Sequence, residues 1–279
     1  MSNLIVTAAL GYNWSHVNNL VKSFRKYSTE TVVIITDNKS KNFKHEAKKN
    51  NVELFYADLN KYKFVNKFNA LFPFFHKYEF SQIRYAIYKE VLFKFPKMQK
   101  IIICDSRDVL FQNDPFKKNY KKNLMFFLEE QKIQNDKRNS LWLKNTVGIK
   151  EYEKIKNNLI SCCGVVLGNY DEINYYISLM SEYLYKKPFQ RSLGHILTFK
   201  PIKPYDQGIH NFLIYNNFFL NCEIINNQNG LVANISYMTN FKKNKFDKMI
   251  NQLGEEYDII HGYDRKIDFF YNQIKKIIL

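Results

Sequence analysis

Two carboxylates stand directly after a short apolar run near the middle of the chain. Residues 101–104 are apolar, and Asp105-Ser106-Arg107-Asp108 follow at once. Such a run is typical of a buried strand, and carboxylates at its tip are costly to bury unless a cation pairs with them. Hard divalent cations prefer carboxylate oxygens and leave positions for phosphate oxygens. Asp105 and Asp108 are therefore candidate ligands of a divalent metal.

Two ordinary explanations of this acidic pair stay open. Aspartates often stabilise tight turns, and Arg107, which lies between them, could form an ion pair with either carboxylate. A ligand site is favoured by the position of the pair, because open α/β sheets bind ligands at the carboxyl ends of their strands.

Other chemically capable residues also stand at the ends of predicted elements. Glu129 and Glu130 follow an apolar run at 124–128, and either is a candidate general base. Gly164 lies in an apolar run, where glycine marks a β-bulge or a close backbone approach. Asp206 begins a helical pattern and could simply cap it. His261 ends a short apolar run, where a histidine is often structural.

Hydrophobic spacing predicts the elements that position these groups. We expect strands at 4–10, 31–36, 52–56, 100–104, 124–128, 161–167 and 259–261, and helices at 14–27, 42–50, 81–95, 171–185, 206–216 and 269–279. Their order at the start of the chain favours a parallel sheet with crossover helices, similar to a Rossmann-type unit without its glycine motif. Segments 62–78 and 188–204 are expected to be irregular, and the polar segment 131–145 to form a loop or short helices over the site.

The composition narrows the protein class. A chain of 279 residues that is 46% hydrophobic suits one domain. Its formal net charge of +16 would attract nucleic acid, an anionic membrane or phosphorylated substrates, although a lysine-rich solvated surface explains it equally well. Basic residues are scattered in pairs without a basic arm, so we expect no nucleic-acid partner and keep a non-enzymatic nucleic-acid-binding protein as an alternative.

The cysteines and the apolar runs predict a location. Cys104, Cys162, Cys163 and Cys222 form no CxxC motif and stand in apolar contexts, which favours reduced, buried thiols. The first apolar run is too short for a secretory signal, and no run approaches a transmembrane span. We therefore expect a cytoplasmic protein.

The segment 105–116, DSRDVLFQNDPF, resembles the metal-binding motif of GT-A glycosyltransferases of the bacterial surface-glycan type. In that family a DxD motif at the end of a buried strand holds a divalent metal on the diphosphate of a nucleotide sugar. Here the motif is one residue longer. The resemblance implies that Asp108 is its second aspartate, and that Asp105 binds the metal or acts through water or the ribose.

Later segments at 162–168, 206–211 and 259–265 extend the resemblance. It implies that Gly164 lines the donor sugar, that Asp206 binds sugar or acceptor or acts as the base, and that His261 completes the metal shell. Arg265 would contact the diphosphate. Arg84, on the helix before the acidic strand, would reach the diphosphate or brace the acidic turn.

The first two predicted strands fit a nucleoside site in the same family. The resemblance places Thr7, Ala8 and Tyr12 in the region that holds the nucleoside, with the Tyr12 ring stacked on the base. Asp37, at the tip of the second strand, would accept a hydrogen bond from the base or ribose, or serve as an ordinary turn residue.

The resemblance implies a single GT-A domain over 1–279, with a mixed, mostly parallel sheet flanked by helices. A nucleotide-binding half would span about 1–110, a half that completes the acceptor and metal sites about 111–265, and a terminal amphipathic helix 266–279. The implied activity transfers a sugar from a nucleotide-diphosphate sugar, with UDP favoured, to a glycan or glycolipid in lipopolysaccharide or capsule biosynthesis. Mn²⁺ or Mg²⁺ would assist departure of the diphosphate.

Two further possibilities concern partners and reaction. The terminal apolar stripe could lie on the anionic inner face of a membrane, pack on the domain or form a homo-oligomer contact; it comprises Phe269, Phe270, Ile274, Ile277 and Ile278, flanked by Lys275 and Lys276. A sugar-phosphate nucleotidyltransferase is the alternative enzyme. Its usual glycine-rich, cationic loop after the first strand is missing, since residues 8–12 contain one glycine and no cation.

Overall fold

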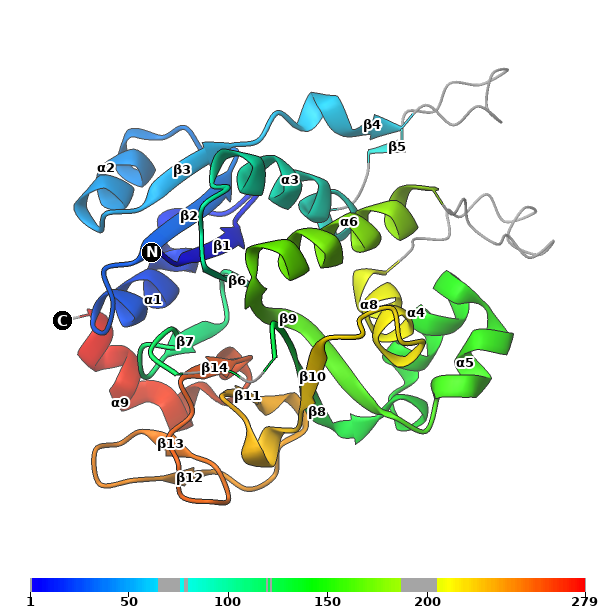
Figure 1. Cartoon of the computed structure of the whole chain (residues 1–279). Coiled ribbons are helices and arrows are strands. Elements are labelled where there is room, and N and C mark those ends of the chain that lie inside the picture. Colours follow the sequence, from blue (N-terminus) through cyan, green and yellow to red (C-terminus); the bar gives the residue numbers. More distant parts are fainter. Residues whose placement is uncertain are drawn as a thin grey trace.

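The computed structural model describes residues 2–64, 76–77, 80–118, 120, 122–186 and 205–278. A seven-stranded sheet with the order β10-β8-β9-β6-β1-β2-β3 forms its centre (Figure 1). These strands span Leu4–Ala8 (β1), Thr31–Thr36 (β2), Glu53–Tyr56 (β3), Lys100–Cys104 (β6), Leu124–Lys132 (β8), Leu159–Asn169 (β9) and Cys222–Ile225 (β10). The predicted mixed, mostly parallel α/β sheet is confirmed at this level, and it joins strands from both predicted halves.

Alternating side chains of the central strands fill two separate cores. Leu4 and Val6 of β1 pack on one face and Ile5 on the other, because successive strand residues point to opposite sides. Helices α3, α6 and α8 cover the first face, and α1 and α2 the second (Figure 1). These helices span Trp14–Arg25 (α1), Lys41–Lys49 (α2), Phe80–Lys94 (α3), Tyr170–Lys186 (α6) and Asp206–Tyr215 (α8). Burial on both faces explains why these strands read as continuous apolar runs.

Strand order reverses between β1 and β6. β1 pairs in parallel with β2 on one side and with β6 on the other. Within this sheet, as the described residues form it, β9 alone runs opposite to its neighbours. The carboxyl ends of β1 and β6 therefore border the crevice where α/β sheets bind ligands, and the acidic pair follows β6 at this place.

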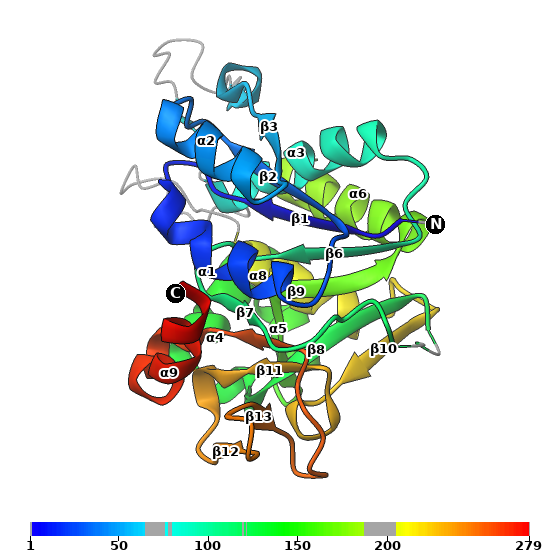
Figure 2. The same ribbon diagram turned by 90° about the vertical axis from the view of Figure 1, so that its left-hand side faces the viewer.

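A second sheet brings the C-terminal part of the chain to the acidic loop. Its order is β11-β14-β7, and it lies beside the large sheet (Figure 2). Its strands span Val109–Phe111 (β7), Val232–Asn234 (β11) and Ile259–His261 (β14). Two short antiparallel pairs complete the strands: Lys63–Phe64 (β4) with His76–Lys77 (β5), and Lys242–Lys243 (β12) with Met249–Ile250 (β13).

The polar segment 131–145 forms more regular structure than predicted. After a 3₁₀ turn it contains α4, Lys137–Val147, which is followed by α5, Ile149–Ile155. The Asp136 side chain caps α4 by accepting a hydrogen bond from the Asn139 amide at 2.6 Å. The helix contains few apolar residues from which it could be predicted, and the Asp136 cap determines where it begins. The predicted irregular segment 188–204, and most of 62–78, lie outside the described residues.

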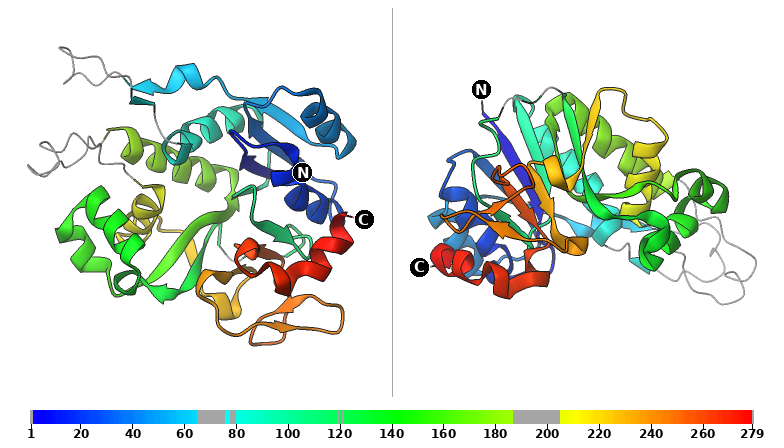
Figure 3. Two further views of the ribbon diagram at one scale, coloured as in Figure 1. Left: turned by 180° about the vertical axis from the view of Figure 1, so that it is seen from behind. Right: turned by 90° about the horizontal axis from the view of Figure 1, so that it is seen from below.

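The terminal helix α9, Ile267–Ile278, packs on the domain. Phe269, Phe270 and Ile274 join a third core cluster under the small sheet, and Phe270 is fully buried. The helix lies beside α1 (Figure 3). The first half of the predicted apolar stripe is thus core, while the side chains of Ile277 and Ile278 lie outside the described residues. No helix among the described residues is long and apolar enough to cross a membrane.

Gln112, directly after β7, ties the acidic motif to the C-terminal part. Its buried amide donates to the carbonyls of Met249 and Tyr257 at 3.1 and 2.8 Å and accepts from the Met249 amide at 2.7 Å. Replacement by alanine would leave these backbone groups unpaired. We expect Gln112→Ala to lower the free energy of unfolding by about 2–4 kcal/mol in urea titrations. Lys117→Ala, at an exposed position, is the control, and equal midpoints for the two variants would contradict this role.

Candidate functional site

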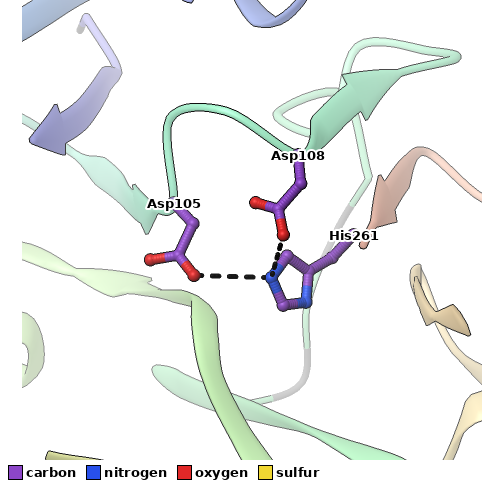
Figure 4. Close-up of side chains that lie close together, drawn as sticks. All are labelled: Asp105, Asp108 and His261. Atoms are coloured by element: carbon purple, nitrogen blue, oxygen red, sulfur yellow. Dashed lines mark ion pairs between the residues drawn. The ribbon is translucent and has the colours of Figure 1, made fainter. Parts of the chain in front are cut away.

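The loop between β6 and β7 places both aspartates at one edge of the sheet. The Asp105 amide donates to the Gly164 carbonyl of β9 at 2.8 Å, which continues the strand pairing by one residue. Ser106 and Arg107 then turn the chain, so that Asp108 precedes β7 with its carboxylate on the same side as that of Asp105 (Figure 4). A four-residue turn therefore gathers two carboxylates where the sequence predicts them.

Strand pairing in the small sheet brings His261 to these carboxylates. His261 lies opposite Val109 in the β14–β7 ladder, and the Gly262 amide donates to the Asp108 carbonyl at 2.8 Å. His261 Nε2 lies 3.5 Å from Asp105 Oδ2 and 3.8 Å from Asp108 Oδ2 (Figure 4). One ligand atom from each residue lies within 4.8 Å of the other two, which is close enough for all three to bind one ion.

Asn234 fixes the histidine tautomer. Its amide nitrogen donates to the carbonyls of Phe127 and Leu128, both at 3.2 Å, so its oxygen faces His261 Nδ1 at 2.8 Å. An amide oxygen can only accept, hence Nδ1 carries a proton, and in the neutral ring Nε2 is the nitrogen that can bind a metal. This support for the candidate metal ligand is not evident from the sequence.

Gly164 leaves room at the centre of the three residues. A Cβ at this position would lie 2.3 Å from both Cε1 and Nε2 of His261 and 3.0 Å from Asp105 Oδ2. A side chain would therefore fill the space that an ion needs. The glycine allows the His261 ring to approach the backbone of β9. It also lies near the place where the pairing of β8 with β9 becomes irregular, since the register shifts after Phe126.

Arg84 of α3 braces two carboxylates beneath the site. Its guanidinium lies 2.7 Å from Asp105 Oδ1 and 2.7 Å from Asp206 Oδ2, and the residue is 7% exposed. Burial would raise the pKa of Asp105, but the charges of Arg84 and His261 lower it to about 2. Asp105 is thus ionised with one oxygen on Arg84 and the other toward His261. Of the two predicted roles for Arg84, the structure shows the brace.

The carboxylates also set the charge of the histidine. Burial alone would lower the pKa of His261, but the hydrogen bond to Asp105 and the charges of Asp108 and Glu129 raise it to about 9. Burial raises the pKa of Asp108. In the metal-free protein a protonated imidazole therefore supplies the counter-charge that a cation would replace.

Helix α8 holds the glycine-bearing strand in place. Gln207 accepts from the Cys163 amide at 3.0 Å and donates to the Ser161 carbonyl at 2.6 Å. Asn211 accepts from the Ser161 amide at 2.8 Å and donates to the same carbonyl at 2.9 Å. The pairing of β6 with β9 ends at Val165, so these side chains of α8 bind the edge of β9 that β6 no longer covers. The spacing of Gln207 and Asn211, one helical turn apart, is the sequence signal for this role.

A cavity of about 290 Å³ opens over these groups. Eight of the predicted site residues line it: Arg84, Asp105, Asp108, Glu129, Gly164, Asp206, His261 and, at the rim, Arg265. Four lining residues on or near α4 and β11 were not predicted as site residues: Arg138, Asn139, Trp142 and Tyr237. The polar segment was expected over the site, and α4 lies there, but its individual contacts depend on packing.

The two candidate bases on β8 lie in different surroundings. Glu129 is buried and lines the cavity, and burial raises its pKa. Glu130 is exposed, does not line the cavity, and faces the other way because neighbouring strand residues alternate. The structure thus brings Glu129 to the site and leaves Glu130 outside it.

The predicted nucleoside residues lie at the same sheet edge but outside this cavity. The Gly11 amide donates to Asp37 Oδ1 at 2.8 Å, which joins the loops after β1 and β2. The Tyr12 ring stacks on His16, with centroids 4.7 Å apart. Thr7 is fully buried and Ala8 nearly so, so their side chains are covered by protein and do not face a ligand in this structure.

All four cysteines are free, as predicted, and Cys162 and Cys163 line the cavity.

Comparison with protein-family models finds no match, and no curated protein sequence matches the chain. The geometry of the site and the residues that carry the resemblance are therefore the basis for assigning a function.

Gly164→Ala tests the space between the three ligands. The added methyl group would displace the His261 ring, so we expect Mn²⁺ affinity to fall by roughly 100-fold, measured by isothermal titration calorimetry. Lys117→Ala is a suitable control because Lys117 is exposed and does not line the cavity. Unchanged affinity in Gly164→Ala would exclude an ion at this position.

Metal affinity should depend on pH through His261. Its pKa of about 9 in the metal-free protein means that an ion must displace a proton at neutral pH. Apparent Mg²⁺ affinity should therefore rise between pH 6.5 and 8.5, by at most about tenfold per unit. In His261→Gln binding should be weaker and this pH slope should vanish. A wild-type affinity that is constant over the window would contradict histidine ligation.

Proposed function

We propose that the protein is a metal-dependent glycosyltransferase of the GT-A type that uses a nucleotide-diphosphate sugar. The observation that carries the proposal is the cluster of Asp105, Asp108 and His261 at the carboxyl end of β6. It lies beside the point where the strand order reverses and opens into a cavity large enough for a sugar ring.

The ligand set fits Mn²⁺ or Mg²⁺. Two carboxylates and one imidazole are hard or intermediate donors, and three protein ligands leave positions for phosphate oxygens. A bound ion would act as a Lewis acid that stabilises the leaving diphosphate. Arg84 keeps Asp105 ionised and oriented, and Asn234 keeps Nε2 of His261 directed at the ion. Gly164, which has no side chain, leaves space for the ion between these ligands.

The sheet edge suggests how the donor lies. The nucleoside would lie over the loops after β1 and β2, near Tyr12 and Asp37. The Tyr12 ring, which stacks on His16 in this structure, would then stack on the base instead. The diphosphate would then cross the acidic loop. Arg265 lies on the turn after His261 and lines the cavity, so its guanidinium can reach the same phosphate oxygens.

Of the two candidate bases that line the cavity, Glu129 and Asp206, Glu129 is better suited to activate an acceptor hydroxyl. Both oxygens of Asp206 are engaged: Oδ2 by Arg84 at 2.7 Å and Oδ1 by the Gln207 amide at 2.8 Å. No ion pair holds Glu129 among the described residues, and burial raises its pKa toward the range of an effective base. Asp206 is better placed to position Arg84 and the sugar.

The acceptor class follows from charge and from the resemblance. A net charge of +16 favours an anionic glycan or glycolipid, such as a lipopolysaccharide or capsule precursor at the inner face of a membrane. UDP remains the favoured nucleotide by the same resemblance. A cytoplasmic location agrees with the free cysteines.

A donor screen tests the proposal. The protein is incubated with a panel of nucleotide-diphosphate sugars and Mn²⁺, and release of the nucleoside diphosphate is followed. We expect one donor to be turned over only when the metal is present. Asp108→Asn should lower this rate by roughly 1,000-fold, because several kcal/mol of charge stabilisation are lost with the metal.

Asp268→Asn is the matched control, since Asp268 is an exposed carboxylate outside the cavity. Circular dichroism of Asp108→Asn shows whether the fold survives. Metal-dependent release of pyrophosphate from a nucleoside triphosphate and a sugar phosphate would instead assign a nucleotidyltransferase. Undiminished turnover in Asp108→Asn would overturn the metal assignment.

A further inference from the structure

The cavity has an acidic floor and a basic, aromatic rim. Carboxylates of Asp105, Asp108, Glu129 and Asp206 line its floor. The rim carries two arginines from separate parts of the chain, and Trp142 of α4 with Tyr237 of the 3₁₀ turn after β11. Negative charge thus lies around the candidate metal ligands, and positive charge lies at the entrance of the cavity.

The two rim arginines are Arg138 and Arg265, and their guanidinium groups carry no ion pair or hydrogen bond to any residue that the structure describes. The other arginines that the structure describes do form such contacts. Arg84 and Arg107 hold carboxylates, and Arg25 donates to four backbone carbonyls. An unpaired guanidinium at a cavity rim offers five donors in a planar fork that matches carboxylate and phosphate groups.

Trp142 is held as a rigid platform one turn along α4 from Arg138. Its ring stacks on Tyr205, with centroids 5.2 Å apart and planes 27° apart. Helix α8 packs closely beneath it, since a Cβ on Gly208 would lie 3.1 Å from the Trp142 carbonyl oxygen. Because α8 also carries Asp206, the platform is fixed relative to the cavity floor. A rigid aromatic face of this kind packs well against the C–H face of a sugar ring.

The two arginines serve different groups. Arg265 follows His261 by four residues and belongs with the metal and the donor diphosphate. Arg138 lies on α4, on the side of the cavity formed by Trp142 and Asn139. If the metal held the donor phosphates, Arg138 would remain available for a second anion, which the acceptor would supply.

We propose that Arg138 and Trp142 form an acceptor subsite for an acidic sugar, with the guanidinium on its carboxylate or phosphate and the indole against its ring. This inference rests on the proposed function and names its acceptor class. It predicts that negative charge on the acceptor sugar itself, close to the reacting hydroxyl, determines the choice of substrate.

The test compares three acceptors that differ at one position: a neutral hexoside, the corresponding uronic acid and the corresponding 6-phosphate. With the donor found in the screen, we expect kcat/KM for one acidic acceptor to exceed that for the neutral one by at least about tenfold. The uronic acid and phosphate arms identify the anion. In Arg138→Gln this preference should shrink to within about twofold.

Lys137→Gln is the matched control, since it removes a neighbouring positive charge on the same helix that does not line the cavity. It should keep the full preference. Trp142→Phe should retain more acceptor affinity than Trp142→Ala. A wild-type protein that prefers the neutral hexoside, or an Arg138→Gln variant that keeps the acidic preference, overturns the subsite.

The two proposals can fail separately. If no nucleotide sugar is turned over with any acceptor, the proposed function fails. Saturation-transfer NMR with the three glycosides then still decides the subsite: acidic glycosides that bind the wild type and Lys137→Gln, and lose binding in Arg138→Gln, support it. Equal binding of all three glycosides to the wild type contradicts it.

Discussion

Uncompensated negative charge at the end of β6 is the constraint around which the site is arranged. Four carboxylates line one cavity, and the cations buried among them are the Arg84 guanidinium and the His261 imidazole. Buried carboxylates are tolerated only with counter-charge or hydrogen bonds. Arg84 neutralises two of them from below, while protonation of His261 in the metal-free protein marks the place where a divalent ion would balance the remaining charge.

Much of the surrounding structure positions this charge. The β14–β7 ladder places His261 beside the acidic loop, and Asn234 orients its ring. Helix α8 holds β9 through Gln207, which sets Gly164 where no side chain can occupy the space. The motif continues to Gln112, which links the same ladder to the C-terminal segments. The preorganised loop therefore depends on contacts between distant parts of the sequence.

The main sheet and the acidic pair could be predicted from the sequence because both follow from local patterns, whereas His261 was expected at the site only from the resemblance. Apolar runs buried on both faces identify β1, β2 and β6, and the acidic pair is visible at the tip of one of them. Glu129 and Glu130 could not be separated, since the register of β8 shifts after Leu128 and strict alternation cannot be counted through it.

The roles of Asn234, Arg138 and Trp142 depend on tertiary contacts and leave no local pattern. Helix α4 is polar, and its approach to α8 through Gly208 emerges only when the two helices pack. The terminal helix is the opposite case, because its apolar pattern is visible in the sequence but the surface on which it packs is not. Its apolar stripe allowed a membrane surface as well as packing or an oligomer contact, and the structure buries Phe270 in the core.

We propose that Asp105, Asp108 and His261 hold one divalent ion through Nε2 of the histidine. Pulsed EPR of Mn²⁺ bound to protein labelled with ¹⁵N-histidine measures this ligation directly. We expect the hyperfine coupling of a single directly bound ¹⁵N nucleus, which disappears in His261→Gln. Bound Mn²⁺ without any ¹⁵N coupling, or a coupling that persists in His261→Gln, would contradict it.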